Sequence, residues 1–157
     1  MADARFEDGD ERPLYLGAED ADDLRVISTL VQDAVLPISE MKYRPSKRQF
    51  ALLLNRFRWE DREAAERSGR GVERVQSLLS FDGVLAVRSH GIDRSDADTV
   101  LSVLSVEWKA GEDGTGAVEI TLAGDGAVAL DMEACDATLR DVTRPYLAPS
   151  RKAPQHG

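Results

Sequence analysis

Cysteine and histidine are nearly absent from this 157-residue chain. The one cysteine, Cys135, cannot form an internal disulfide, and no second cysteine is present to help it build a metal site. The two histidines, His90 and His156, stand far apart, so the ligand spacing of a zinc site does not occur. We therefore expect no metal and no cofactor.

Long apolar runs and catalytic signatures are also missing. No segment approaches the length of a membrane span, and residues 1–12 lack the apolar centre of a secretory signal, so we expect a cytoplasmic protein. The chain has neither a Gly-Lys-Ser/Thr phosphate loop nor a Gly-x-Ser-x-Gly motif. The 29 acidic residues offer no recognisable catalytic pair. No catalytic residue can be named, and a non-enzyme is favoured.

Negative charge dominates the chain, but its distribution is uneven. The formal net charge is −9, made of −8 over residues 1–40, +5 over residues 41–74 and −6 over residues 75–157. An acidic chain disfavours nucleic acid as a partner, because neutralisation of phosphates supplies most of that affinity. The basic segment still permits an anionic partner at one face, or ion pairs with the acidic segments of the same molecule.

Two apolar stripes at helical spacing predict two helices. Leu24, Ile27 and Val31 belong to the first stripe, which predicts an amphipathic helix from Asp20 to about Ala34. The second stripe runs from Met132 to Val142 and predicts a C-terminal helix of about three turns. The helices bracket a region that is rich in strand patterns.

Seven consecutive antiparallel strands are predicted between Ile38 and Leu130, joined by short connections that include a tight turn at Asp82-Gly83. Such a set curls or closes to protect its edges. We therefore predict an α+β fold, with a pleckstrin-homology-like barrel or a strongly curled sheet and the C-terminal helix plugging one open end. An open sheet with both helices on one face is the alternative. Residues 13–147 form the single domain, and residues 1–12 and 148–157 are expected to be disordered.

Cationic and aromatic residues interleave at the end of the second predicted strand, where Arg56 and Arg58 precede Trp59. Lys42 and Arg44 share a period of two on the adjacent predicted strand, so all four cations can emerge on one side of the sheet. This basic-aromatic face predicts a site for a protein or a small anionic ligand. The alternative is that Phe57 and Trp59 lie in the core while the arginines point outward on the opposite face.

These patterns favour a small, non-catalytic binding module that acts through the basic-aromatic face. Two other functions stay open. In the first alternative, the chain is an enzyme or a ligand-binding protein with a pocket at the barrel mouth. In the second, it is a homo-oligomer in which the edge of the hairpin pairs with itself.

Three strings of residues resemble those of an uncharacterised bacterial family from alphaproteobacteria, domain of unknown function 2948. They are Asp20-Ala21-Asp22-Asp23-Leu24, Gln32-Asp33-Ala34 and Leu53-Leu54-Asn55-Arg56-Phe57-Arg58-Trp59-Glu60. The resemblance covers roughly residues 14–147. It implies a cytoplasmic bacterial protein, and it supplies no catalytic residue.

Overall fold

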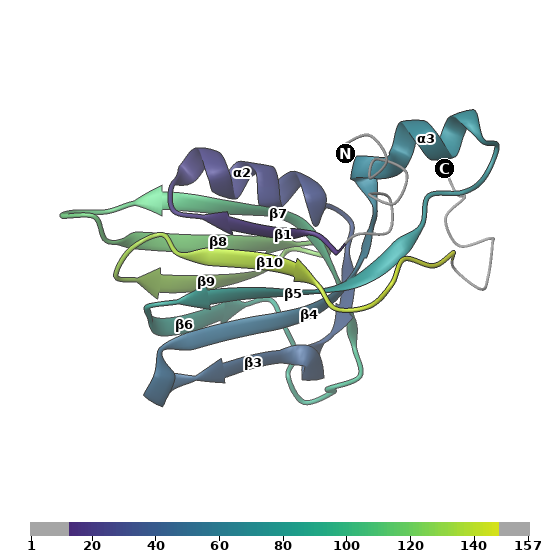
Figure 1. Cartoon of the computed structure of the whole chain (residues 1–157). Helices are drawn as coiled ribbons and strands as arrows, with labels where there is room; N and C mark the ends of the chain where they lie inside the picture. The colour runs from purple at the N-terminus through teal and green to yellow at the C-terminus, as the bar shows by residue number, and fades with distance from the viewer. Residues whose placement is uncertain (1–12, 148–157) are drawn as a thin grey trace.

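The computed structural model of the chain describes residues 13–147, which are mostly β-structure (Figure 1). The strands are β1 (Tyr15–Ala18), β2 (Val35–Pro37), β3 (Met41–Arg44), β4 (Gln49–Phe57), β5 (Arg74–Asp82), β6 (Val84–His90), β7 (Val100–Ala110), β8 (Gly116–Leu122), β9 (Gly126–Met132) and β10 (Ala137–Asp141). The helices are α2 (Ala21–Leu30) and the short α3 (Arg62–Arg67), and three single 3-10 turns are η1 (Ile38–Glu40), η2 (Pro45–Lys47) and η3 (Trp59–Asp61). The predictions for residues 1–12 and 148–157 lie outside the described residues.

All the strand pairs are antiparallel and belong to one sheet of ten strands, in the order β1-β10-β5-β4-β2-β7-β8-β9-β6, with β3 paired to β4 beside this path. The sheet folds back on itself, so that β7, β8, β9 and β6 lie behind β1, β10, β5 and β4 (Figure 1). Helix α2 packs across β7 and β1 and covers the space between the two layers on that side. Within residues 13–147 the two end strands of this order, β1 and β6, do not pair with each other, so the sheet is open.

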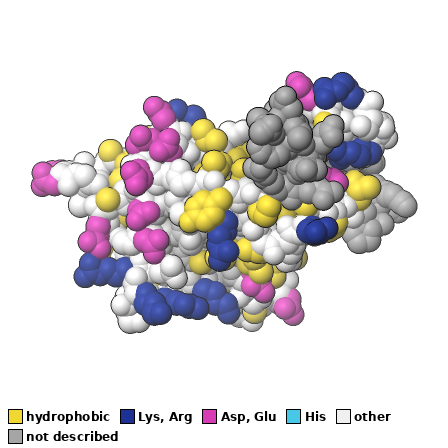
Figure 2. All heavy atoms as spheres, in the orientation of Figure 1, with side chains coloured by type: hydrophobic (Ala, Val, Ile, Leu, Met, Phe, Trp, Pro, Cys, Tyr) yellow, Lys and Arg dark blue, Asp and Glu magenta, His cyan; other side chains and the backbone are white. Residues whose placement is uncertain are grey.

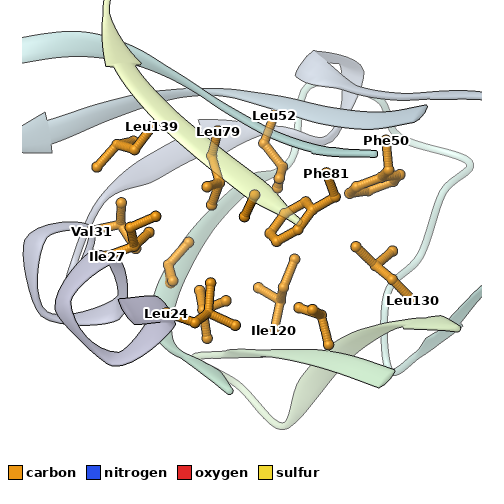
Figure 3. Packing of buried hydrophobic residues seen from close by; sticks show 14 of the residues in the cluster. Leu24, Ile27, Val31, Phe50, Leu52, Leu79, Phe81, Ile120, Leu130 and Leu139 are labelled. Atoms are coloured by element: carbon orange, nitrogen blue, oxygen red, sulfur yellow. The ribbon is translucent and has the colours of Figure 1, made fainter. Parts of the chain in front are cut away.

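The hydrophobic core fills the space between the two layers. In β4 and β5, every second residue is buried, which is the period expected of strands with one face against a core. Figure 3 shows side chains from the front layer, the back layer and α2 converging on one another; the labelled ones are Leu24, Ile27, Val31, Phe50, Leu52, Leu79, Phe81, Ile120, Leu130 and Leu139. Burial of each such side chain contributes about 1.5–3 kcal/mol, so this cluster is the main source of stability.

The predicted α+β fold is wrong, because the described residues are largely β-structure with only two short α-helices. The predicted C-terminal helix does not form, and the barrel that it was to plug is wrong with it. Residues 137–141 form strand β10, which lies between β1 and β5 and pairs with both. Leu139 is opposite Leu16 on one side and Leu79 on the other, and Ala137 and Leu139 are buried at a spacing of two. The strand gains backbone hydrogen bonds along both edges, which outweighs a helical stripe of only about three turns.

Two connections also differ from expectation. The turn at Asp82-Gly83 does not join a hairpin, because β5 pairs with β4 and β10 while β6 pairs with β9. The chain instead passes there from one layer of the sheet to the other, and Gly83 adopts the positive φ of 81° that the sharp change of direction requires. The connection from β4 to β5 contains helix α3, which the strand prediction for this region did not include.

Candidate functional site

The five predicted site residues lie in different environments. Lys42 and Arg44 are exposed on β3, Arg56 and Arg58 are buried at the end of β4, and Trp59 is half-buried in η3. The expected single cationic face is therefore not formed. Whether any of these residues binds a partner stays a prediction.

The register of the β3–β4 pair explains why the face is divided. Lys42 lies opposite Ala51 and Arg44 lies opposite Gln49, so even-numbered residues of β3 share a face with odd-numbered residues of β4. Arg56 therefore points to the other side, in line with the buried residues of β4, and Arg58 directly beyond the strand is buried as well. The alternative, in which the arginines were to point outward from a core of Phe57 and Trp59, is reversed in the structure.

Arg56 is fully buried and is held by several oxygen atoms at once. Its guanidinium donates to both carboxylate oxygens of Glu60 at 2.9 and 2.8 Å and to the Asp141 carboxylate at 3.0 Å. Its Nε donates to Ser77 Oγ at 3.0 Å, and the Ser77 hydroxyl in turn donates to Asp141 at 2.7 Å. These contacts link β4, β5 and β10, which are far apart in the sequence.

Arg58 extends the same arrangement. Its Nη1 donates to the Glu73 carboxylate at 2.6 Å and to Asp61 at 3.3 Å, and its backbone N–H donates to the Glu73 carbonyl oxygen at 2.8 Å. Arg70 donates to Asp61 at 2.7 Å from the other side. We name the following residues the ionic cluster: Arg56, Arg58, Glu60, Asp61, Arg70, Glu73 and Asp141.

The electrostatics of the ionic cluster are those of a structural network. Burial alone would lower the pKa of Arg56, but the hydrogen bond and charge of Glu60 and the charge of Asp141 raise that pKa above its ordinary value. Burial alone would raise the pKa of Glu60, but the hydrogen bond and charge of Arg56 hold it below its usual range. With three arginines against four carboxylates, the cluster carries no excess positive charge, so an added anion would meet net repulsion.

The aromatic side chains beside the cluster are also held within the protein. Phe57 and Trp59 pack against each other with ring centroids 5.1 Å apart. The Arg74 guanidinium lies 4.6 Å from the Phe57 centroid, and the Arg62 guanidinium lies 5.9 Å from that of Trp59. Trp59 Nε1 donates to the Gln32 carbonyl oxygen at 3.0 Å, which ties η3 to the turn after α2. Trp59 is therefore a fixed part of the framework rather than a freely exposed anchor.

A different group of cations stays on the surface. Lys42 and Arg44 of β3, Lys47 of η2 and the adjacent Arg48 are all exposed, and no acidic residue occurs between positions 41 and 48. Arg48 pairs with Glu133 at 2.7 Å, whereas within residues 13–147 the other three cations have no ion pair. We name these four residues the cationic edge. Figure 2 shows a row of Lys and Arg side chains along the lower border of the molecule, where Figure 1 draws β3.

The turn after β3 places the cations of η2 next to those of the strand. Arg48 adopts a left-handed conformation with φ of 51°, and its N–H donates to the Pro45 carbonyl oxygen at 3.0 Å. The Arg48 carbonyl oxygen accepts the N–H of Val84 at 2.8 Å, which ties the turn to the start of β6. The sequence argument missed Lys47 and Arg48 as site residues, although the run of four cations without an acid was visible in it.

Other features of the described residues do not assemble a reactive centre. Cys135 is buried, and burial, with the nearby charges of Asp20 and Asp136, raises the pKa of its thiol to about 11, so it stays protonated at neutral pH. A groove of about 290 Å³ lies where β2, β4 and β7 meet. It is lined mainly by apolar side chains, and the buried Oδ1 of Asn55 has no hydrogen-bond partner there among the described residues. Because the sheet is open, this groove is not the barrel mouth of the ligand-binding alternative.

Comparison with known proteins gives a family but no chemistry. The sequence model of a family described as "Protein of unknown function (DUF2948)" matches residues 14–156 and confirms the resemblance seen in the sequence. Neither a curated protein nor a solved structure matches the chain. Among residues 13–147, no helix combines the length and apolar character needed to cross a membrane, and no group of three or more His, Cys, Asp or Glu side chains is placed to hold a metal ion.

Proposed function

The chain belongs to the DUF2948 family of proteins of unknown function, and we propose that it is a non-catalytic binding module whose cationic edge takes an anionic partner. One observation carries the proposal. Lys42, Arg44 and Lys47 lie within six residues of one another in the chain and are exposed without an acidic partner among the described residues, in a chain whose net charge is −9.

Because acidic residues are abundant in this molecule, a group of neighbouring cations that all lack an ion pair is unexpected. Several exposed cations of the described part pair with nearby carboxylates, among them Arg25 with Asp22 at 3.0 Å and Arg88 with Asp131 at 2.7 Å. Four others have no ion pair among residues 13–147, namely Arg67, Arg94, Arg140 and Arg144, but only the cationic edge gathers three such residues within positions 42–47. Three of the four charges of the cationic edge have no ion pair among the described residues, and two of them, on Lys42 and Arg44, share one face of β3. Like charges at neighbouring positions repel one another most strongly within the Debye length of about 8 Å at physiological salt. An anionic group that approaches this edge replaces repulsion between like charges with attraction.

The charge balance also bears on the class of partner. Nucleic-acid affinity requires many phosphate contacts, and a patch of four cations on an otherwise acidic molecule supplies few of them. An acidic stretch of protein or a small anionic ligand needs only a few opposite charges. The proposed partner is therefore of this second kind.

Binding of fluorescent polyglutamate tests the proposal, measured by anisotropy at rising salt. The edge variant is K42Q/R44Q/K47Q, and the matched control is R25Q/R62Q/K109Q, which removes the same number of charges from exposed, ion-paired positions. Wild type and control should bind and release the probe as salt rises, while the edge variant should lose about tenfold or more in affinity. Equal losses in the two variants, or no binding by wild type, would overturn the proposal.

A further inference from the structure

We infer that the cationic edge recognises an extended acidic segment of a partner protein, which pairs with the free edge of β3 as an added strand. The inference rests on the proposed function and specifies the class and the conformation of the partner. It depends on three features of β3: an unpaired edge, an alternation of side chains, and a charge that excludes a second copy of the same strand.

The backbone of β3 has a free edge. Within residues 13–147, β3 pairs only with residues 49–52 of β4, and no other strand lies along its opposite side. This edge lies at the opening of the folded sheet, because the turn that follows β3 is hydrogen-bonded to the start of β6, the last strand of the sheet order. Unpaired N–H and C=O groups at such an edge are a template for an incoming strand.

The side chains of β3 define what the incoming strand should carry. Lys42 and Arg44 are exposed, whereas Met41 and Tyr43 are half-buried and pack against the core, with the Tyr43 ring 6.5 Å from that of Phe50. Directly opposite residues of paired strands share a face of the sheet. An added strand should therefore place acidic residues beside the two cations and apolar residues beside Met41 and Tyr43, and a further acidic residue can reach Lys47.

The same charges exclude self-pairing through this edge. Two copies of β3 placed edge to edge would bring lysine and arginine side chains together, and like charges on directly paired strands are destabilising. Charged side chains on an exposed edge thus keep copies of the chain apart while they attract a strand of opposite sign. This argues against the homo-oligomer in which the hairpin edge pairs with itself.

Short synthetic peptides test the inference. The probe is a capped peptide of about seven residues in which Glu and Val alternate, and its isomer carries all the Glu residues in one block. Two further versions of the alternating peptide are N-methylated on one or the other set of alternate backbone nitrogens. Wild-type protein should bind the alternating peptide about tenfold or more tightly than the block isomer. One N-methylated version should lose binding and the other should keep it, because only one set of N–H groups faces β3.

A variant with reversed charges shows whether a loss of peptide binding comes from the changed charges or from unfolding of the protein. K42E/R44E should lose the Glu–Val peptide and gain binding to the corresponding Lys–Val peptide, which an unfolded protein would not do. If wild type binds polyglutamate but treats the alternating and block peptides alike, or tolerates both N-methylated versions, the strand-addition inference is overturned and the proposed function stands. If wild type binds neither polyglutamate nor the peptides, both fail.

Discussion

The segment from Met41 to Glu60 contains two sets of cations that lie in opposite environments, one buried and one exposed. Arg56 and Arg58 are buried and bonded to carboxylates, whereas Lys42, Arg44 and Lys47 are exposed and have no acidic partner among the described residues. The two sets are close in sequence and have the same sign of charge. What separates them is the face of the sheet and the acids that the rest of the fold brings to each face.

The buried set shows what is needed to place a charge in a protein interior. A guanidinium loses much of its hydration on burial, and the loss is offset only when its donors are satisfied with good geometry. Asp141, only 3 % exposed in its side chain, and Glu60 supply the opposite charges for Arg56. The exposed set keeps its water and needs no such partners, so it is available to a ligand.

Loss of a buried arginine should have the largest effect. Arg56→Gln leaves the buried Asp141 carboxylate without its ion pair and leaves Glu60 without its bidentate partner. We expect the free energy of unfolding to fall by about 3–5 kcal/mol, because the Asp141 carboxylate stays buried without an opposite charge. Urea unfolding followed by circular dichroism measures the change. A loss below about 1 kcal/mol would show that solvent reaches the cluster.

An intermediate effect is expected from Glu60, and it should depend on pH. The folded state holds the pKa of Glu60 below its ordinary value, so Glu60 stabilises the fold above the unfolded pKa of about 4.3 and loses that contribution as pH falls through the folded pKa. Glu60→Gln should be less stable than wild type at neutral pH, and the difference should shrink below about pH 4. Unfolding free energies measured across acidic pH give the comparison.

Asp136 provides a control for Glu60, because its pKa is shifted in the opposite direction. Asp136 is exposed, but partial desolvation, and then the charges of Asp82 and Glu19, raise its pKa, so its ionised form slightly destabilises the folded state at neutral pH. Asp136→Asn should therefore stabilise the protein at neutral pH, with an advantage that disappears as pH falls. Parallel pH profiles for the two variants would contradict both assignments.

A smaller effect is expected where the framework joins η3. Trp59→Phe keeps an aromatic ring beside Phe57 but removes the N–H that donates to the Gln32 carbonyl oxygen. Loss of this one hydrogen bond should cost about 0.5–1.5 kcal/mol of unfolding free energy and leave polyglutamate binding unchanged. Differential scanning calorimetry with the anisotropy assay checks both parts. Weaker binding at unchanged stability would place Trp59 in the site after all.

The strand region was well indicated by the sequence because its signals are local. Val118, Ile120 and Leu122 alternate with the polar residues Glu119 and Thr121, and in strand β8 the first three are buried while the other two are half-buried. The C-terminal strand failed because its partners are remote. Leu139 lies opposite Leu16 and Leu79, which are distant in the sequence, so the residues around position 139 do not reveal these pairings.

The candidate site was predictable to a smaller extent. The excess of positive charge between residues 41 and 48 is visible in the sequence, and it does form an exposed patch. The burial of Arg56 was not predictable, because Asp141 is 85 positions away in the chain. The five-residue connection from Arg44 to Arg48 also fixes the strand register weakly, and a shift by one residue exchanges the two faces.

Two double variants with the same charge change test the central division most directly. Urea unfolding should show K42Q/R44Q within about 0.5 kcal/mol of wild type, because both side chains are exposed and neither has an ion pair among the described residues. R56Q/R58Q should lose at least about 3 kcal/mol or fail to fold, because its buried carboxylates lose their partners. Equal stabilities of the two variants would contradict the account, since they would mean that both sets of cations occupy the same kind of environment.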